Sequence, residues 1–170
     1  MARGRVLPIV LNPKAVAVGL AGAGEGLARR RAMLAESGVE PVAVSGDASL
    51  AGLGVLFIAG LEAPAAGALA ARARAFGILV NIEDVAELCD FHVPASVRRG
   101  DLLLTASTGG RAPGLARRLR EWLERSFGPE WHRHLDDVGA ARAGWREAGL
   151  PADEVSRRTA DLVAREGWLA

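Results

Sequence analysis

The chain has 170 residues, which fits one domain of about 150 residues plus a small appendage and excludes two full catalytic domains. Half of its residues are hydrophobic, so it can bury a sizeable core, while 21 basic and 20 acidic side chains leave a net charge of +1. Because neither sign forms a block, we expect no nucleic-acid partner and no binding to an anionic membrane surface.

A single cysteine, Cys89, excludes an internal disulfide framework and fits a reducing compartment. The apolar stretch 6–11 is too short for the core of a signal peptide. The longest uncharged stretch, 48–61, falls short of the roughly 20 residues that span a bilayer. We therefore expect a cytoplasmic protein without a membrane segment.

Short apolar runs alternate with helical segments over the first two thirds of the chain. Strands are predicted at 16–21, 41–45, 55–59, 78–82 and 101–107, and helices at 25–36 and 64–76. This alternation indicates a parallel sheet with both faces covered. Beyond Pro113, apolar stripes that begin at Leu115, Trp131 and Val155 predict three helices. The sequence thus predicts an α/β fold, with a Rossmann-like domain over 1–110 and a helical region over 111–170.

A glycine-rich turn, Gly22-Ala23-Gly24-Glu25-Gly26, joins the first predicted strand to the first predicted helix. Such a turn lets backbone amides at a helix N-terminus approach a dinucleotide diphosphate. Asp47 follows the second strand, where a carboxylate would accept a hydrogen bond from the adenosine ribose. No arginine lies near it in the sequence, so NAD is favoured over NADP. The alternative is a glycine turn that binds no nucleotide.

Two features depart from the dinucleotide-binding pattern. Leu27 stands at the third glycine position, unless Gly26 serves there after a one-residue deletion. The segment 45–55 is also too short for the helix and strand that a full mononucleotide half would place there, so we expect the sheet to lack an edge strand.

The central segments resemble a known family. Residues 81–84 (Asn-Ile-Glu-Asp), 87–89 (Glu-Leu-Cys), 91–95 (Phe-His-Val-Pro-Ala), 99–102 (Arg-Gly-Asp-Leu) and 107–113 (Ser-Thr-Gly-Gly-Arg-Ala-Pro) stand almost in register with motifs of that family. In these motifs the chain is similar to the siroheme synthase family, whose members are precorrin-2 dehydrogenases with or without sirohydrochlorin ferrochelatase activity.

The resemblance implies NAD-dependent oxidation of precorrin-2, Fe2+ as a substrate if chelation follows, and a homodimer built through exchanged helical regions. The important aspartate of the family maps to Asp84, which could accept a proton or briefly hold the metal. A carboxylate-rich tetrapyrrole calls for polar and forked donors near the site. The expected substrate-binding residues are Asn81, Ser107, Thr108, Gly109, Arg111 and Arg117.

Other interpretations of the same residues stay open at this point. The chain could be a chelatase that has lost NAD binding, or a tetrapyrrole-binding module without activity, and the metal could be iron or cobalt. Cys89, Asp90 and His92 match no structural zinc pattern, and Cys89 is interpreted as a small buried side chain. The role of His92 is left open.

Overall fold

The computed structural model describes residues 6–169, and the chain divides into two compact units, Met1–Val93 and Pro94–Ala170. The first unit contains β1 (Ala17–Gly22), α1 (Gly24–Glu36), β2 (Val42–Val44), β3 (Leu53–Ala59), α2 (Ala63–Ala75), β4 (Leu79–Ile82) and the short 3-10 helix η1 (Ala86–Leu88). The second unit contains β5 (Ala95–Arg99), β6 (Leu102–Ala106), α3 (Pro113–Ser126), α4 (Trp131–Glu147) and α5 (Ala152–Arg165).

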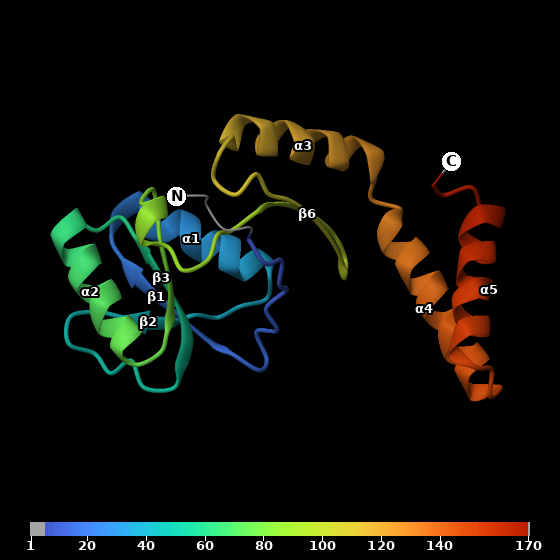
Figure 1. Ribbon diagram of the computed structural model, residues 1–170, viewed down its shortest axis with the longest axis horizontal. Helices are drawn as coiled ribbons and strands as arrows, with labels where there is room; N and C mark the ends of the chain where they lie inside the picture. Colours follow the sequence, from blue (N-terminus) through green and yellow to red (C-terminus); the bar gives the residue numbers. More distant parts are fainter. Residues whose placement is uncertain (1–5, 170) are drawn as a thin grey trace. The chain divides into compact units, whose positions relative to one another are not determined.

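The first unit is built on a parallel four-stranded sheet in the order β2-β1-β3-β4 (Figure 1). The chain leaves β1 through α1 toward β2 on one side, and leaves β3 through α2 toward β4 on the other. The carboxyl ends of β1 and β3 therefore form the topological switch point at which open α/β sheets bind ligands. This confirms the predicted α/β, Rossmann-like fold class.

Side-chain alternation along the strands sends two apolar layers to opposite faces of this sheet. On β3, Phe57 packs in the layer that includes Leu34 of α1, whereas its neighbour Ile58 packs in the layer that includes Ala70 of α2. Because successive strand residues point to opposite faces, α1 and α2 cover opposite sides of the sheet.

The sheet is short on the β2 side, as the length of the chain predicts. β2 is an edge strand with Val42 52% exposed, and the connection to β3 contains no helix or further strand. Instead, residues 45–52 return along the α2-covered face, where Leu50 is fully buried in the core. The expectation that an edge strand is missing is confirmed.

The second unit corrects one prediction. The strand expected at 101–107 does not join the parallel sheet, because β6 pairs with β5 in an antiparallel hairpin closed at Gly100 and Asp101. The compact units accordingly divide after Val93, whereas the sequence placed the boundary near residue 110. The local physical reason is the tight turn at Gly100, whose φ of 59° suits glycine and brings the two strands together.

The helices of the second unit follow the predicted apolar stripes. Arg99 donates from Nε to the carbonyl oxygen of Phe127 at 2.8 Å and from Nη2 to that of Glu124 at 3.2 Å, which ties β5 to the end of α3. Between α4 and α5, Val155 is buried and Arg142 Nη1 donates to Thr159 Oγ1 at 3.2 Å. Within the part of the chain that is described, no helix is both long and apolar enough to cross a membrane.

Candidate functional site

The glycine turn lies against the carboxyl end of β3. The backbone N–H of Ala23 donates to the carbonyl oxygen of Ala59 at 3.1 Å. Gly22 has a φ of 151°, and a Cβ added there would collide with that same carbonyl oxygen. Gly60, with a φ of 67°, meets the Ala23 carbonyl oxygen in the same way. Because Gly22 and Gly60 have no side chain, the backbones that follow β1 and β3 can come into contact at the switch point.

The first turn of α1 faces the open carboxyl edge with free donors. The first backbone bond of the helix runs from Leu27 N to Ala23 O at 3.3 Å, so the N–H groups of Gly24, Glu25 and Gly26 have no partner within the helix. Gly24 has a φ of 58°, and nothing lies within 4 Å of a Cβ added to it. Free amides, open space and the positive end of the helix dipole fit a dinucleotide diphosphate.

Gly26 is the glycine that allows α1 to pack closely on the sheet. A Cβ added at Gly26 would stand 2.5 Å from Glu83 Oε2 and 2.9 Å from Gly60 N. Leu27 instead packs into the apolar layer between α1 and the sheet. Gly26 therefore takes the place of the third glycine of the dinucleotide-binding pattern, one residue earlier than usual.

The loop after β4 carries the predicted catalytic carboxylate to the same edge. Glu83 N donates to Ile58 O at 2.9 Å, which continues the strand pairing up to the residue before Asp84. Asp84 is exposed and has a φ of 61°. Within residues 6–169 it is the one residue other than glycine with a positive φ, a conformation that costs of order 1–3 kcal/mol and concentrates at functional sites.

A cation lies close to this loop from α1. Burial lowers the pKa of the Arg30 guanidinium, whereas the charges of Glu83, Cys89 and Asp84 raise it. Its Cζ lies 5.3 Å from the centroid of the Phe57 ring. Arginine stays protonated in spite of such burial, so Arg30 contributes a fixed positive charge on the α1 side of the Asp84 loop.

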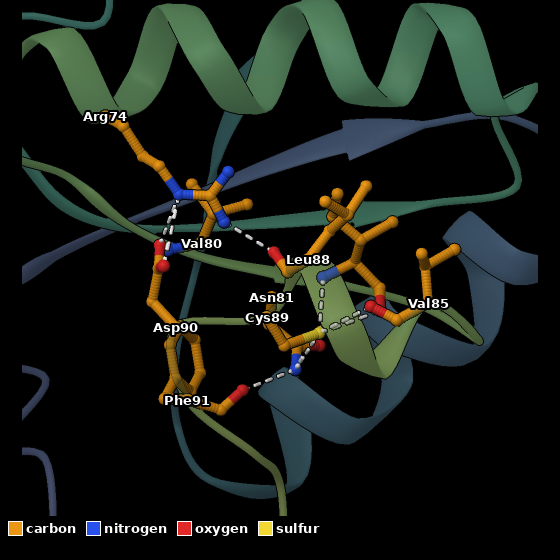
Figure 2. Close-up of polar contacts among 9 residues, drawn as sticks. Arg74, Val80, Asn81, Val85, Leu88, Cys89, Asp90 and Phe91 are labelled. Carbon is orange, nitrogen blue, oxygen red and sulfur yellow. Dashed lines mark hydrogen bonds and ion pairs between the residues drawn. The ribbon is translucent and has the colours of Figure 1, made fainter. Parts of the chain in front are cut away.

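The loop is closed by side chains that bond to its backbone (Figure 2). Asp90 accepts from Val80 N at 2.9 Å, and its carboxylate pairs with Arg74 Nε at 3.1 Å. The Asn81 side chain is only 6% exposed and donates from Nδ2 to Phe91 O at 2.9 Å. Asn81 was expected to bind substrate. In the structure its amide nitrogen fastens the loop.

Asp47 lies beside an arginine of α2. Its carboxylate lies 3.5 Å from Arg72 Nη1, and Arg72 also donates to Gly46 O at 3.0 Å and Ala48 O at 2.9 Å. Arg72 lies in the last turn of α2, which runs from the carboxyl ends of the strands back toward their amino ends. Arg72, which is distant in the sequence, therefore stands beside Asp47, a neighbour that the sequence argument for NAD over NADP did not include.

In the second unit, the predicted substrate residues form the turn that opens α3. Thr108 accepts from Arg111 N through its carbonyl oxygen and from Ala112 N through Oγ1, both at 3.2 Å. Ser107 Oγ accepts from Gly109 N at 3.2 Å. The Arg111 side chain is exposed. These bonds fix the backbone of the turn, while the guanidinium group of Arg111 is exposed to solvent.

Two arginines of α3 already form ion pairs with a glutamate of the same helix. Arg117 Nε lies 3.3 Å from Glu121 Oε1, and Arg118 Nη1 lies 3.1 Å from Glu121 Oε2. Desolvation raises the pKa of Glu121, but the hydrogen bond and charge of Arg118, joined by Arg117, outweigh it and hold that pKa below its usual range. An anionic ligand of Arg117 would compete with this carboxylate.

Within residues 6–169, no group of three or more His, Cys, Asp or Glu side chains is placed to hold a metal ion. Asp84 is exposed, and so is His92.

Comparison with known proteins adds independent evidence. A family model described as NAD(P)-binding matches residues 46–95, a range that starts after the glycine turn. The siroheme synthase of Azotobacter vinelandii is 34% identical over 83% of this chain and 38% of its own length. The siroheme biosynthesis protein met8 of Schizosaccharomyces pombe is 35% identical over 48% of this chain and 30% of its own length.

The chain belongs to the siroheme synthase family. It spans less than two fifths of the length of the curated siroheme synthases that it matches. Among solved structures, SirC, a precorrin-2 dehydrogenase, superposes with a TM-score of 0.73 at 16% identity, over 97% of this chain and 93% of that one. At that identity the likeness describes the fold, a Rossmann-like unit followed by a helical one.

Sequence reasoning missed several residues of this family member's site. Gly60 carries a signal that was available, because it ends the apolar run of β3 just as Gly22 ends that of β1. Arg30 carries none, since its place at the edge depends on how α1 packs against the sheet. The same holds for the bonds that the Cys89 thiol makes.

Proposed function

We propose that this chain catalyses the NAD-dependent oxidation of precorrin-2 to sirohydrochlorin. The observation that carries the proposal is the meeting, at one edge of the first unit, of a glycine turn with free helix amides and a loop that presents Asp84 in a left-handed conformation. Membership of the siroheme synthase family supports the choice of substrate.

The residues of the glycine turn would hold the cofactor. The N–H groups of Gly24, Glu25 and Gly26 would donate to the diphosphate, while Gly22 and Ala23 keep the turn against β3. When bound, NAD supplies the nicotinamide ring that accepts a hydride from the macrocycle. Asp84 accepts the proton that leaves the substrate in the same desaturation, so that two electrons and both hydrogens are accounted for.

The second unit would bind the carboxylates of the tetrapyrrole. Ser107, Thr108 and Gly109 lie in a turn at the start of α3, and Arg111 is exposed beside them. Arg117 joins these donors if it leaves Glu121. Arginine forks suit such carboxylates because two parallel N–H groups match the two oxygens.

A second activity is favoured by the short connection after β2. Residues 45–52 leave no helix or strand on the side where adenosine would lie, so dinucleotide affinity could be lost while the tetrapyrrole site is kept. In that case the chain is a sirohydrochlorin ferrochelatase. Fe2+ is then a substrate, and Asp84 relays the two protons that leave the pyrrole nitrogens.

We also propose a homodimer built through the helical region. Leu115 and Trp122 lie on one stripe of α3, and each is 55% exposed. Apolar side chains of this size favour an interface with a second copy. Light scattering should return twice the monomer mass, and a monomer at micromolar concentration would contradict this assignment.

The central experiment follows NADH formation. Purified protein, mixed anaerobically with precorrin-2 and NAD, should increase the NADH absorbance band and convert the macrocycle spectrum to that of sirohydrochlorin. Calorimetry with NAD alone separates the two activities. If NAD does not bind but sirohydrochlorin binds and takes up Fe2+, the ferrochelatase is correct. If the folded protein turns over neither substrate, both activities fail.

Replacing Asp47 with asparagine should change the Kd for NAD by less than about twofold. Asp47 is tied to Arg72 in the last turn of α2, whereas a ribose acceptor would lose a charge-assisted hydrogen bond worth about 1.5–3 kcal/mol, or more than tenfold in Kd. Titration calorimetry distinguishes these values. A tenfold weaker Kd would restore Asp47 as the ribose ligand that the sequence predicts.

A further inference from the structure

The thiol of Cys89 bonds to the backbone on both sides of Asp84. Cys89 Sγ accepts a hydrogen bond from Ile82 N at 3.2 Å, and its proton reaches Ile82 O at 3.2 Å or Val85 O at 3.3 Å. Ile82 precedes Asp84 by two residues and Val85 follows it directly. One half-buried atom thus holds both ends of the segment that carries the carboxylate (Figure 2).

Further contacts hold Cys89 itself in place. Asp90 N donates to Val80 O at 2.8 Å, and the Asp90 carboxylate is bound by Val80 N and by Arg74. On the other side of the thiol, Asn81 Nδ2 lies 3.6 Å from Sγ and also donates to Phe91 O. The thiol is therefore supported from β4 and from α2, so it can act as a fixed point for the loop.

Asp84 needs such a fixed point. Its φ of 61° is a backbone conformation that residues other than glycine rarely adopt. Its side chain is exposed, and its carboxylate accepts no hydrogen bond from the residues that the structure describes. Backbone bonds from Glu83 N to Ile58 O at 2.9 Å and from Val85 N to Ile82 O at 3.4 Å shape the turn. The bonds of Cys89 are the side-chain contacts that add to them on both sides of Asp84, so their loss should let the carboxylate shift from its place at the carboxyl edge.

We propose that Cys89 is a positioning residue for Asp84, acting through its hydrogen bonds to Ile82 and Val85. This inference rests on the proposed function in that Asp84 is the proton acceptor. A small displacement of a reacting group lowers the rate of the chemical step, while substrate binding elsewhere is unaffected. The predicted signature is therefore a change in kcat with an unchanged KM.

The test compares two substitutions at Cys89 in the full chain. Cys89→Ala removes the donor and the acceptor, and should lower kcat for precorrin-2 oxidation by about tenfold with KM within about twofold. Cys89→Ser keeps both functions on a shorter bond and should recover most of that loss. Hydrogen exchange at the Ile82 amide, which donates to Sγ, should be faster in Cys89→Ala than in the unmodified protein.

Leu69→Ala serves as the control for general destabilisation. Leu69 packs against the same core from α2, so its truncation should lower the melting temperature and leave kcat and Ile82 exchange unchanged. If Cys89→Ala has no larger effect on kcat than Leu69→Ala, the positioning role is wrong. Should Cys89→Ala fail to fold, Cys89→Val takes its place, because valine also lacks the donor and the acceptor. An unmodified kcat and an unmodified Ile82 exchange rate in that variant would overturn the role of Cys89.

Failure of the proposed function is distinguishable from failure of this inference. If the unmodified protein binds precorrin-2 but does not oxidise it, the proposed activity is wrong. The Ile82 exchange rates still report whether Cys89 holds the loop. Normal turnover combined with equal exchange in all variants rejects the role of Cys89 alone.

Discussion

Replacing Asp84 with asparagine should lower kcat for precorrin-2 oxidation by about 10²–10⁴-fold, the usual contribution of a positioned proton acceptor. Asparagine has nearly the same shape and tolerates the left-handed region, so the φ of 61° at this position is retained. The substitution therefore removes the basic oxygen and little else. The Kd for NAD should stay within about twofold, since the glycine turn is unchanged.

Glu87→Gln is the matched control for this substitution. Glu87 lies three residues further along the same loop, in η1, and is exposed. The Glu87→Gln substitution removes one negative charge from the same loop and leaves the proposed proton acceptor unchanged, so kcat should stay within about twofold. Equal rates for Asp84→Asn and the unmodified protein would place the proton acceptor elsewhere.

The order and type of most elements were predictable because their signals are local. The apolar runs of β1, β3 and β4 and the glycines that follow helices α1 and α2 are read directly from the sequence. The β5–β6 hairpin was not predicted. Its strand β5 contains Arg98 and Arg99 and lacks a continuous apolar run, so only its pairing with β6 defines it as a strand.

The candidate site shows the same difference between local signals and tertiary contacts. The glycine turn was predicted because it lies at the end of a strand whose position was predictable, and Asp84 was predicted from the resemblance to the family. The environment of Asp47 was not, since Arg72 reaches it from α2 through tertiary packing. The bonds of Cys89 likewise depend on a loop conformation that the sequence does not specify.

Replacing Gly22 with alanine should destabilise the first unit by about 3–5 kcal/mol, the range of severe single substitutions. Gly22 has a φ of 151°, and an added Cβ would collide with the Ala59 carbonyl oxygen. That oxygen also accepts from Ala23 N. Relief of the collision requires β1 and β3 to separate at the switch point, which breaks this bond. Since domains have only about 5–15 kcal/mol of net stability, much of the first unit's margin would be lost.

Urea unfolding with two probes can localise this loss. All four tryptophans lie in the second unit, at Trp122, Trp131, Trp145 and Trp168. Tryptophan fluorescence therefore reports on the second unit, whereas far-ultraviolet circular dichroism reports on both. An effect confined to the first unit shifts part of the dichroism transition to lower urea and leaves the fluorescence midpoint unchanged.

Gly24→Ala separates steric collision from backbone strain. Gly24 also has a positive φ, 58°, but nothing lies within 4 Å of an added Cβ. Its substitution should cost only the left-handed penalty of about 1–2 kcal/mol. If Gly22→Ala and Gly24→Ala shift the dichroism transition equally, contact between Gly22 and β3 does not hold the switch point together. A clearly larger shift for Gly22→Ala means that the two strands must meet without a side chain for the cofactor turn to form.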